Sequence, residues 1–507
     1  MLCVTGGETT TRQLAARLAA GRPFDMQEVR LDLLDHVDDE VLGLVGRRNV
    51  IATCRSSGER GGFRGTERER FALLTRALAH EPGYLDVELS SDRGLRQQLF
   101  GQRGTTRLVL SAHEWAAEGD GPAPSAPERL AEIGRAMSAE PADVLKIAVE
   151  MTDAAELGPL RDLLRHEGRP VVRVGMGPAG SVGRALPCRL GSAWTYVRAD
   201  DAAATAPGQL TMSQALAWRI DQSAQLVPLG LLGGPQVLRS PGPAVYNRLF
   251  AELGAPFLYL PVVTSRPLET LALLEGLGFA GLSVTMPAKE ALLGQLDELD
   301  VLASRVGAVN TVRLRDGRRF GLNTDVGAVW ELLSAHAGAR ALVLGAGGAA
   351  RAAVVALRDL GCSVTVAGRS ASRTSALAQA LSVTAVSWDG RAREPFDVLV
   401  NATPCGGDGA SDPMPFTAPL TNCAVLDLVL APDTTPLLKR VAQGGGEAIR
   451  GIEMWLLQGA RQVSALTGLR VRPDDLRRYL PAPPTQSESS KREEPGSAPD
   501  LRDGARP

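Results

Sequence analysis

The segment 339–370, ARALVLGAGGAARAAVVALRDLGCSVTVAGRS, decides the fold of the second half of this chain. An apolar run typical of a buried strand leads into the glycine-rich GAGGAA, and a helical pattern then leads into a second apolar run. Small residues between a strand and a helix let the backbone approach a pyrophosphate at the helix N-terminus. The segment predicts the opening unit of a doubly wound, Rossmann-type domain.

The glycine-rich turn and the end of the second strand together predict a cofactor. The expected phosphate-binding residues are Gly345, Ala346, Gly347, Gly348 and Ala349. Folds that prefer NAD carry an acidic residue after the second strand, whereas this chain has Arg369 and Arg373 there, which favours the 2′-phosphate of NADP. The alternative is that these are two ordinary arginines of an arginine-rich chain.

Three polar positions precede this domain. GLSVTMPAKE carries Lys289, GAVNT carries Asn310 and LNTDVG carries Asp325. A lysine–aspartate pair beside a nicotinamide can hydrogen-bond a substrate hydroxyl and move its proton as a hydride is transferred. The alternative for Lys289 and Asp325 is a surface ion pair.

The first half alternates strand-like and amphipathic segments. The expected strands are Leu2–Thr5, Met26–Leu31, Val50–Cys54, Tyr84–Glu88, Arg107–Ser111, Val144–Val149, Pro170–Val174 and Trp194–Arg198. Eight strands that are each followed by a helix predict a closed parallel (β/α)8 barrel. The helix after the seventh strand is the least regular, because GPAGSVGRALP is rich in glycine and proline.

Polar residues collect where these strands end, which is where barrel enzymes place their chemistry. The candidates are Glu28, Arg30, Arg55, His113, Lys146, Arg184, Thr205 and Gln209. Their arrangement predicts one polar cavity at one mouth of the barrel, in which the arginines bind an anionic group.

Lys146 is the most informative of these residues. Only four of the 55 basic residues are lysine, yet one of them lies inside the apolar strand of PADVLKIAVE. A lysine amine can condense with a ketone, whereas a guanidinium stays protonated and is no nucleophile. Apolar surroundings and nearby arginines favour a neutral amine, and His113 on the next strand is suited to proton transfer. The alternative is a structural lysine paired with Glu28 or Glu88.

The overall composition excludes several classes of function. The 507 residues carry a net charge of −2, which offers no bulk attraction to nucleic acid or anionic membranes. We expect no membrane span, because no run of about 18 apolar residues exists, and no signal peptide, because the N-terminus lacks a basic segment followed by an apolar one. The six cysteines form no CxxC pair, so we expect no metal site and reduced thiols in the cytoplasm. Residues 481–507 are rich in Pro, Ser and charge and predict a disordered tail. The sequence predicts no oligomeric state.

The motifs of the first half resemble a known family. EVRLD, TCR, DVE, SAHEW, DVLKIA, MGPAGSVGR and TAPGQ are similar, in order and spacing, to type I 3-dehydroquinate dehydratase over about residues 1–220. The resemblance implies that Lys146 forms an imine with the substrate ketone and that His113 removes the adjacent proton. It implies substrate binding by Glu28, Arg30, Arg55, Arg184, Thr205 and Gln209. The family usually has Ser at the position of Thr205, and the longer loop CRSSGERGGFRG leaves Glu59 unassigned.

The second half resembles shikimate dehydrogenase over about residues 226–480. The motifs are VTMPAK, GAVNT, NTD, GAGGAAR, NATPCG, DLVLAPDTTPLL and GIEMWLLQGA. The resemblance implies a catalytic pair, Lys289 and Asp325, and NADP as cofactor. It implies substrate binding by Ser240, Thr285, Asn310 and Gln458.

This half departs from the family pattern at several positions. Gly242 replaces a serine of the substrate loop, Arg239 replaces a histidine and Leu430 replaces a tyrosine. Gly407 and Gly368 replace a methionine and an asparagine. Our hypothesis is that Arg239 compensates by binding the substrate carboxylate directly.

Together the two resemblances imply consecutive steps of the shikimate pathway on one chain. We expect a dehydratase barrel at 1–222, a substrate domain at 226–330 with a return of 452–480, and a Rossmann NADP domain at 331–451. The chain would convert 3-dehydroquinate to 3-dehydroshikimate and reduce that to shikimate with NADPH. The alternatives are a second half that accepts quinate or another cyclic hydroxy acid, and one half that is a degenerate scaffold.

Overall fold

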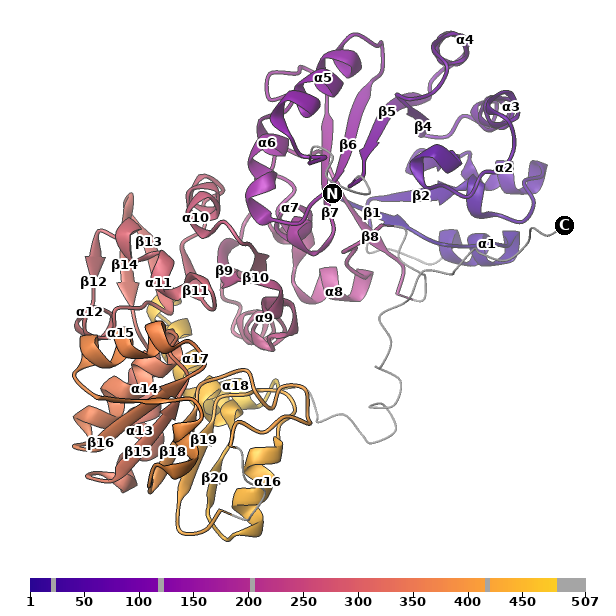
Figure 1. Cartoon of the computed structure of the whole chain (residues 1–507). Helices are drawn as coiled ribbons and strands as arrows, with labels where there is room; N and C mark the ends of the chain where they lie inside the picture. The colour runs from indigo at the N-terminus through magenta and orange to yellow at the C-terminus, as the bar shows by residue number, and fades with distance from the viewer. Residues whose placement is uncertain (20–23, 117–122, 201–205, 415–419, 481–507) are drawn as a thin grey trace, which may run out of the picture.

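The computed structural model describes residues 1–19, 24–116, 123–200, 206–414 and 420–480 (Figure 1). Of the sequence predictions, Thr205 and the tail 481–507 lie outside these residues. The first half contains a parallel sheet in the order β7-β6-β5-β4-β3-β2-β1-β8. Its strands are β1 (Leu2–Thr5), β2 (Met26–Arg30), β3 (Val50–Thr53), β4 (Tyr84–Glu88), β5 (Arg107–Glu114), β6 (Val144–Glu150), β7 (Val171–Met176) and β8 (Thr195–Arg198).

This sheet is a nearly closed barrel, so the predicted fold class is confirmed. β7 and β8 lie side by side, and a hydrogen bond from Ala193 N to Val171 O (2.8 Å) joins the segments at their amino ends. Seven predicted strands agree with the structure to within two residues at each end. β5 was predicted too short, because it continues to Glu114 and carries His113 on the strand itself.

Helices cover the outside of the barrel (Figure 1). They are α1 (Thr11–Ala19), α2 (Asp39–Val45), α3 (Glu67–Leu78), α4 (Arg93–Gly101), α5 (Pro127–Ser138), α6 (Leu157–Asp162), α7 (Ser181–Ala185) and α8 (Met212–Ala217). α3 shows how the sequence starts such a helix, since Thr66 and Glu69 form a reciprocal capping box and Phe71 and Leu74 face the core. α7 is a single short turn of helix, as its glycine- and proline-rich sequence suggests.

The second half contains two further sheets. The first has the order β10-β9-β11-β13-β14-β12 and is mixed, because β13 runs antiparallel to β11 and β14. Its strands are β9 (Val227–Gly233), β10 (Phe257–Val263), β11 (Gly281–Val284), β12 (Glu298–Leu299), β13 (Thr311–Arg315) and β14 (Arg318–Leu322). Its helices are α9 (Gly242–Glu252), α10 (Pro267–Gly276), α11 (Ala288–Ala291), α12 (Val301–Val306), α13 (Asp325–Leu333), α17 (Gly451–Thr467) and α18 (Pro473–Arg477). α17 returns from the end of the chain and packs against β11 and β13.

The other sheet is parallel, in the Rossmann-type order β17-β16-β15-β18-β19-β20. Its strands are β15 (Arg340–Leu344), β16 (Ser363–Gly368), β17 (Thr384–Ser387), β18 (Val398–Asn401), β19 (Ala424–Asp427) and β20 (Glu447–Ile449). Its helices are α14 (Gly348–Asp359), α15 (Ala371–Leu381) and α16 (Pro436–Gln443). The apolar run and the glycine turn at 339–370 form β15, α14 and β16, as predicted.

The barrel and the mixed sheet share one apolar core. A continuous cluster of buried side chains includes Leu157 and Val182 from the barrel and Leu260 and Leu273 from the second half. The first half is therefore packed directly against the second rather than tethered by a long linker.

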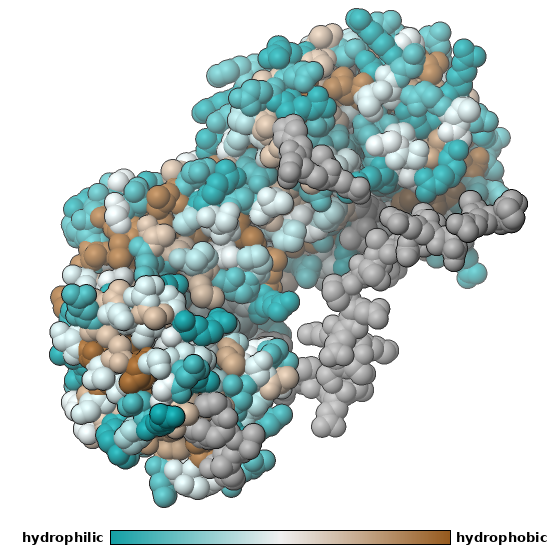
Figure 2. All heavy atoms as spheres, in the orientation of Figure 1, coloured by the Kyte–Doolittle hydropathy of each residue, from teal (hydrophilic) through white to brown (hydrophobic). Residues whose placement is uncertain are grey.

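The surface gives little indication of a partner. Hydrophilic residues dominate the face of the barrel shown in Figure 2, and hydrophobic residues are more frequent over the second half. Among the residues that the structure describes, the most exposed large hydrophobic residue is Val301, at 74%. Within the described ranges, every helix is too short or too polar to cross a bilayer.

Candidate active sites

Lys146 lies buried in the middle of β6, inside the barrel. Its Nζ is 3.1 Å from Asp86 Oδ2 and 3.4 Å from Glu28 Oε1, and it lies over the ring of Tyr196. The ion pair with Glu28 is the contact expected for a structural lysine, and Arg55, one of the arginines expected nearby, pairs with the same Asp86. Alternate residues of a strand point inward, so the carboxylates on β2 and β4 reach the same interior layer as the amine.

Arg55 is the centre of the charge network beside Lys146. Its guanidinium is 3.1 Å from Asp86, 3.2 Å from Glu59 and 3.3 Å from Glu88. Burial would lower the pKa of Arg55, but Asp86 and Glu59 raise it above its ordinary value. For the acid Asp86 burial acts in the opposite direction and would raise the pKa, but Arg55 and Lys146 hold the pKa well below its ordinary value. These buried groups are therefore charged and paired.

His113 lies on the same inner face as Lys146. Ser111 is directly opposite Lys146 across the β5–β6 pair, and His113 follows two residues later. Burial lowers the pKa of His113 well below 6.5, and the charges of Arg55 and Lys146 lower it further. The imidazole is therefore neutral near pH 7 and able to accept a proton.

Glu59 is a site residue that the sequence left unassigned. It is buried, and its Oε2 lies 2.8 Å from His113 Nδ1, while its Oε1 accepts a hydrogen bond of 2.6 Å from Ser90. Burial raises the pKa of Glu59 above its ordinary value. The sequence did not identify this role, because the loop after β3 is longer than in the family and the spacing from Arg55 to Glu59 could not be matched to the family motif. Asp86 was noted in the DVE motif but was given no role.

The remaining barrel residues surround the mouth. Arg30 pairs with Asp32 at 2.6 Å. Arg184 on α7 donates hydrogen bonds to the carbonyls of Gly175 (2.9 Å) and Pro207 (3.2 Å), and burial alone lowers its pKa to about 10. Neither carbonyl neutralises the charge of Arg184, so this buried cation is suited to an anionic ligand.

Gln209 is also buried, in the segment that packs on the turn after β7. A side chain at its neighbour Gly208 would approach Gly177 O to 2.4 Å. The structure thus brings seven of the eight predicted barrel residues to one mouth, while Thr205 lies in the part of the chain left undescribed.

The second site is built around Asp325, the first residue of α13. Lys289 Nζ lies 2.5 Å from Asp325 Oδ2, and Asn310 Nδ2 donates a hydrogen bond of 2.8 Å to Asp325 Oδ1. Gln458 on α17 lies 3.5 Å from the same amide. These four of the six predicted catalytic and substrate residues lie together, with side-chain exposures of 16% for Lys289 and 4% for Asp325.

The glycine turn lies directly against this pair. A Cβ atom on Gly348 would lie 3.0 Å from Lys289 Cδ, so a larger residue would push the lysine aside. Gly345 has a φ of +117° and approaches Ala402 O, which also favours glycine. A nucleotide bound at the N-terminus of α14 would therefore lie next to Lys289.

Other predicted residues lie at the rim of this site. Arg369 and Arg373 follow β16 and are exposed, and Arg373 is 3.4 Å from Glu290. Thr285 directly follows β11 and is half-buried. Ser240 accepts a hydrogen bond of 3.2 Å from Gly242 N at the start of α9.

The substituted positions have defined surroundings. Arg239 is exposed beside Ser240, and Leu430 is 36% exposed. Gly242 is buried, and a Cβ there would lie 3.3 Å from Tyr259. A serine at position 242 would thus be a tight fit on this backbone.

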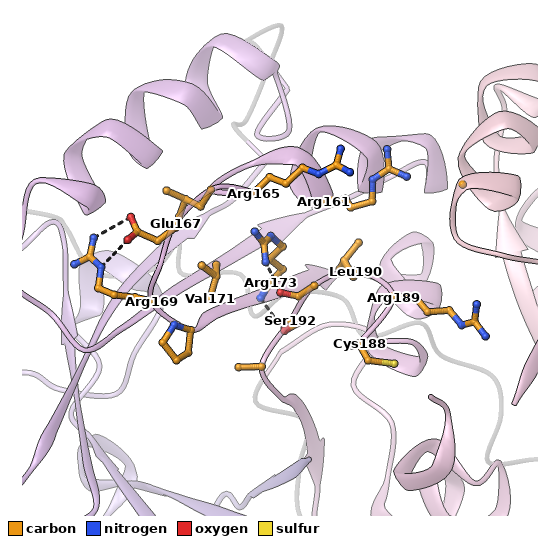
Figure 3. A pocket seen from close by; sticks show the side chains of 15 residues that line it. Arg161, Arg165, Glu167, Arg169, Val171, Arg173, Cys188, Arg189, Leu190 and Ser192 are labelled. Carbon is orange, nitrogen blue, oxygen red and sulfur yellow. Dashed lines mark hydrogen bonds and ion pairs between the residues drawn. The ribbon is translucent and has the colours of Figure 1, made fainter. Parts of the chain in front are cut away.

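A separate cavity of about 680 Å³ opens at the amino ends of β7 and β8, against Gly276 (Figure 3). Its arginines are already bonded, since Arg169 pairs with Glu167 at 2.9 Å and Arg173 donates to Leu163 O at 2.6 Å. Because parallel barrels place their chemistry at the opposite, carboxyl ends of the strands, we do not count this cavity as an active site.

The fold and the two sites define a class of protein in which a barrel with a lysine buried in its interior is joined to a Rossmann-type oxidoreductase. Residues 1–219 match the family model for type I 3-dehydroquinase. Residues 232–312 match the model for the shikimate dehydrogenase substrate binding domain.

Known proteins resemble either the second half or nearly the whole chain. A shikimate dehydrogenase (NADP(+)) of Synechococcus sp. (strain JA-3-3Ab) is 39% identical over 51% of this chain and 94% of the relative. The bifunctional 3-dehydroquinate dehydratase/shikimate dehydrogenase of Arabidopsis thaliana, a chloroplastic protein, is 29% identical over 88% of this chain and 78% of the relative. The shikimate biosynthesis protein AroDE of Chlamydia pneumoniae is 27% identical over 91% of this chain and 94% of the relative. The chain belongs to the shikimate dehydrogenase family, and its first half is a type I 3-dehydroquinase domain that precedes the dehydrogenase part.

Proposed function

We propose that this chain is a bifunctional enzyme that dehydrates 3-dehydroquinate to 3-dehydroshikimate and then reduces 3-dehydroshikimate to shikimate with NADPH. The observation that carries the proposal is that one chain holds two candidate sites, Lys146 with His113 and Lys289 with Asp325. We assign the dehydratase to 1–222, the substrate domain to 226–330 with 452–480, and the nucleotide domain to 331–451. The six free cysteines support a reducing compartment such as the cytoplasm.

In the barrel, Lys146 supplies the amine that attacks the substrate ketone. Loss of one water gives a protonated imine, which withdraws electrons from the neighbouring carbon. Neutral His113 removes a proton from that carbon, and a hydroxyl leaves the next carbon as water after it is protonated. Hydrolysis of the imine consumes one water and restores Lys146, so the net reaction loses a single water.

The other barrel residues bind and orient the substrate. Arg184 is the buried cation that lacks a neutralising partner in its two hydrogen bonds, so we assign it to the carboxylate. Arg30, Arg55, Glu28 and Gln209 surround the ring hydroxyls, and Thr205 is assigned to the same group by the family motif.

In the second half, NADPH supplies the hydride when it is bound. Gly345–Ala349 and the α14 N-terminus would hold its pyrophosphate, and Arg369 and Arg373 its 2′-phosphate. Lys289 and Asp325 hold the substrate oxygen by hydrogen bonds and deliver its proton. Asn310 fixes the Asp325 carboxylate, and with Ser240, Thr285 and Gln458 it binds the rest of the substrate.

Borohydride trapping tests the barrel chemistry. Wild-type protein incubated with 3-dehydroshikimate and borohydride should gain a reduced adduct on Lys146, measured by peptide mass spectrometry. Lys146→Ala should gain none, whereas Lys439→Ala, which removes an exposed lysine on α16, should trap normally. A wild type that traps nothing would eliminate the imine mechanism.

A second candidate, altered specificity of the dehydrogenase, is favoured by Gly242 and Arg239. Gly242 lacks the hydroxyl that the family's serine would offer to the carboxylate, and Arg239 beside Ser240 offers a cation instead. Turnover of shikimate and quinate by the wild type distinguishes the candidates. Arg239→Ala should raise the KM for the preferred acid, and an unchanged KM would contradict direct carboxylate binding.

A further inference from the structure

The carboxylate of Asp153 joins the two halves of the chain. Asp153 follows β6, the strand of Lys146, and is buried at 4% exposure. Its Oδ1 accepts a hydrogen bond from the Thr264 hydroxyl (2.9 Å), and its Oδ2 accepts from the Ser265 N–H (2.7 Å) and hydroxyl (2.8 Å). Burial alone would raise the pKa of Asp153, but these hydrogen bonds and one from Ala155 N lower it. Asp153 is thus an ionised carboxylate in which both oxygens accept hydrogen bonds.

The partners of Asp153 lie at the carboxyl end of β10. Thr264 N donates a hydrogen bond of 2.8 Å to Gly233 O, at the end of the neighbouring parallel strand β9. Asp153 also follows the carboxyl end of its strand. Its hydrogen bonds to Thr264 and Ser265 therefore connect the carboxyl edge of the barrel to the carboxyl edge of the mixed sheet, where α/β folds place their functional residues.

A second contact lies next to the first. α7, the short helix that carries Arg184, packs against β10, and Ser181 Oγ donates a hydrogen bond of 3.2 Å to Pro261 O. The helix makes only a few internal hydrogen bonds of its own, so its position depends strongly on this support.

The segments after β6 and β7 also contact each other. Met151 N donates a hydrogen bond of 3.1 Å to Met176 O, and a Cβ on Gly177 would lie 2.8 Å from Met151 O. The Arg184 side chain in turn is bonded to Gly175 O. The second half therefore holds both segments as one unit, through Asp153 on one side and α7 on the other.

We propose that Thr264 and Ser265 are positioning residues for the dehydratase: by fixing Asp153 they hold the segments after β6 and β7 in the arrangement that presents Arg184 to the substrate carboxylate. This inference rests on the function proposed above for the barrel. Lys146 and His113 lie within ladder-bonded strands and do not depend on this junction. Loosening the junction therefore weakens substrate binding and leaves the chemical step at saturation nearly intact.

The test uses the full chain with Ser265→Ala, Thr264→Val and the double variant. We expect the dehydratase KM for 3-dehydroquinate to rise about tenfold in the double variant, with kcat within about twofold of wild type. Borohydride trapping at saturating substrate should remain complete. Ser265→Thr keeps the hydroxyl and should retain most of the wild-type KM. Asp153→Asn should raise KM in the same way if it folds, and the double variant provides the test if it does not.

Thr152→Val is the matched control. Its hydroxyl donates to Glu156 (3.1 Å) within the first half, one residue from Asp153, so its loss should leave KM unchanged. An unchanged KM in the double variant, even with a lower melting temperature, would overturn the positioning role while leaving the proposed function intact. A wild type without dehydratase turnover would overturn both.

Discussion

Glu59 Oε2 lies 2.8 Å from His113 Nδ1, although the two residues are 54 positions apart in the sequence. A carboxylate on Nδ1 fixes the ring orientation and leaves Nε2 available to the substrate, and it stabilises the imidazolium that forms on proton transfer. Glu59 is itself held by Ser90 and Arg55. His113, the base that we propose for the dehydratase, is therefore oriented by a residue from the loop after β3.

Glu59→Gln should lower the dehydratase kcat by about 10- to 100-fold, because the amide orients the ring but does not stabilise its positive charge. The KM should change by less than about threefold, since Glu59 is not assigned to substrate binding. Steady-state kinetics on the full chain measure both constants. Ser90→Ala removes only one support of Glu59 and should show a smaller loss of kcat, and a wild-type kcat in Glu59→Gln would contradict the role.

The pH dependence of the dehydratase should reflect the shifted His113. Burial, Arg55 and Lys146 lower the pKa of His113 well below 6.5. In the proposed mechanism the base is the neutral imidazole, so on the acidic side activity is lost when the pH falls through this lowered pKa. The acidic limb of the kcat/KM profile should therefore lie below pH 6.5. A half-maximal rate at or above pH 6.5, measured on protein that remains folded by circular dichroism, would show that His113 is not the titrating base.

Gly348→Ala should impair the dehydrogenase through Lys289. The new methyl group would lie 3.0 Å from Lys289 Cδ and 3.1 Å from its Cβ, so the lysine must shift and its 2.5 Å contact with Asp325 is disturbed. We expect kcat/KM for 3-dehydroshikimate to fall by about tenfold or more, as small displacements of a catalytic group do. Dehydratase activity on the same chain serves as an internal reference. Gly294→Ala, at a glycine where a Cβ has no neighbour within 4 Å, is the matched control, and equal losses in both variants would contradict a specific effect.

The cofactor preference should depend on Arg369 and Arg373. Both are exposed beyond β16, at the position where the ribose phosphate of NADP would lie. The double variant Arg369→Ala, Arg373→Ala should raise the KM for NADPH by about 10- to 100-fold, the scale of two charge-assisted hydrogen bonds, and leave the KM for NADH nearly unchanged. Arg470→Ala, another exposed arginine, controls for net charge. An equal rise in the KM for NADPH and for NADH would show that these arginines do not bind the 2′-phosphate.

Much of this molecule follows from local sequence patterns. The strand–turn–helix pattern around GAGGAA and the eight strand–helix repeats depend on periodicity, small residues and turns, which act over a few residues. Lys146 could be recognised because a charged amine inside an apolar strand is costly wherever the strand lies. For Lys289 and Asp325 the motifs supplied the residues, and the tertiary structure places their side chains 2.5 Å apart.

The partners of these residues were decided by the tertiary structure. Which carboxylates contact Lys146 depends on the stagger of β2 and β4 around the barrel, and the contact of Glu59 with His113 depends on the path of an irregular loop. The bridge from Asp153 to Thr264 and Ser265 requires two separately folded halves to pack against each other. Such contacts join residues 54 to 118 positions apart, and their geometry is set by the packing of the whole core rather than by any local pattern. The sequence by itself therefore determined the fold class and the reactive groups, and only the tertiary structure decided how those groups are paired, oriented and supported.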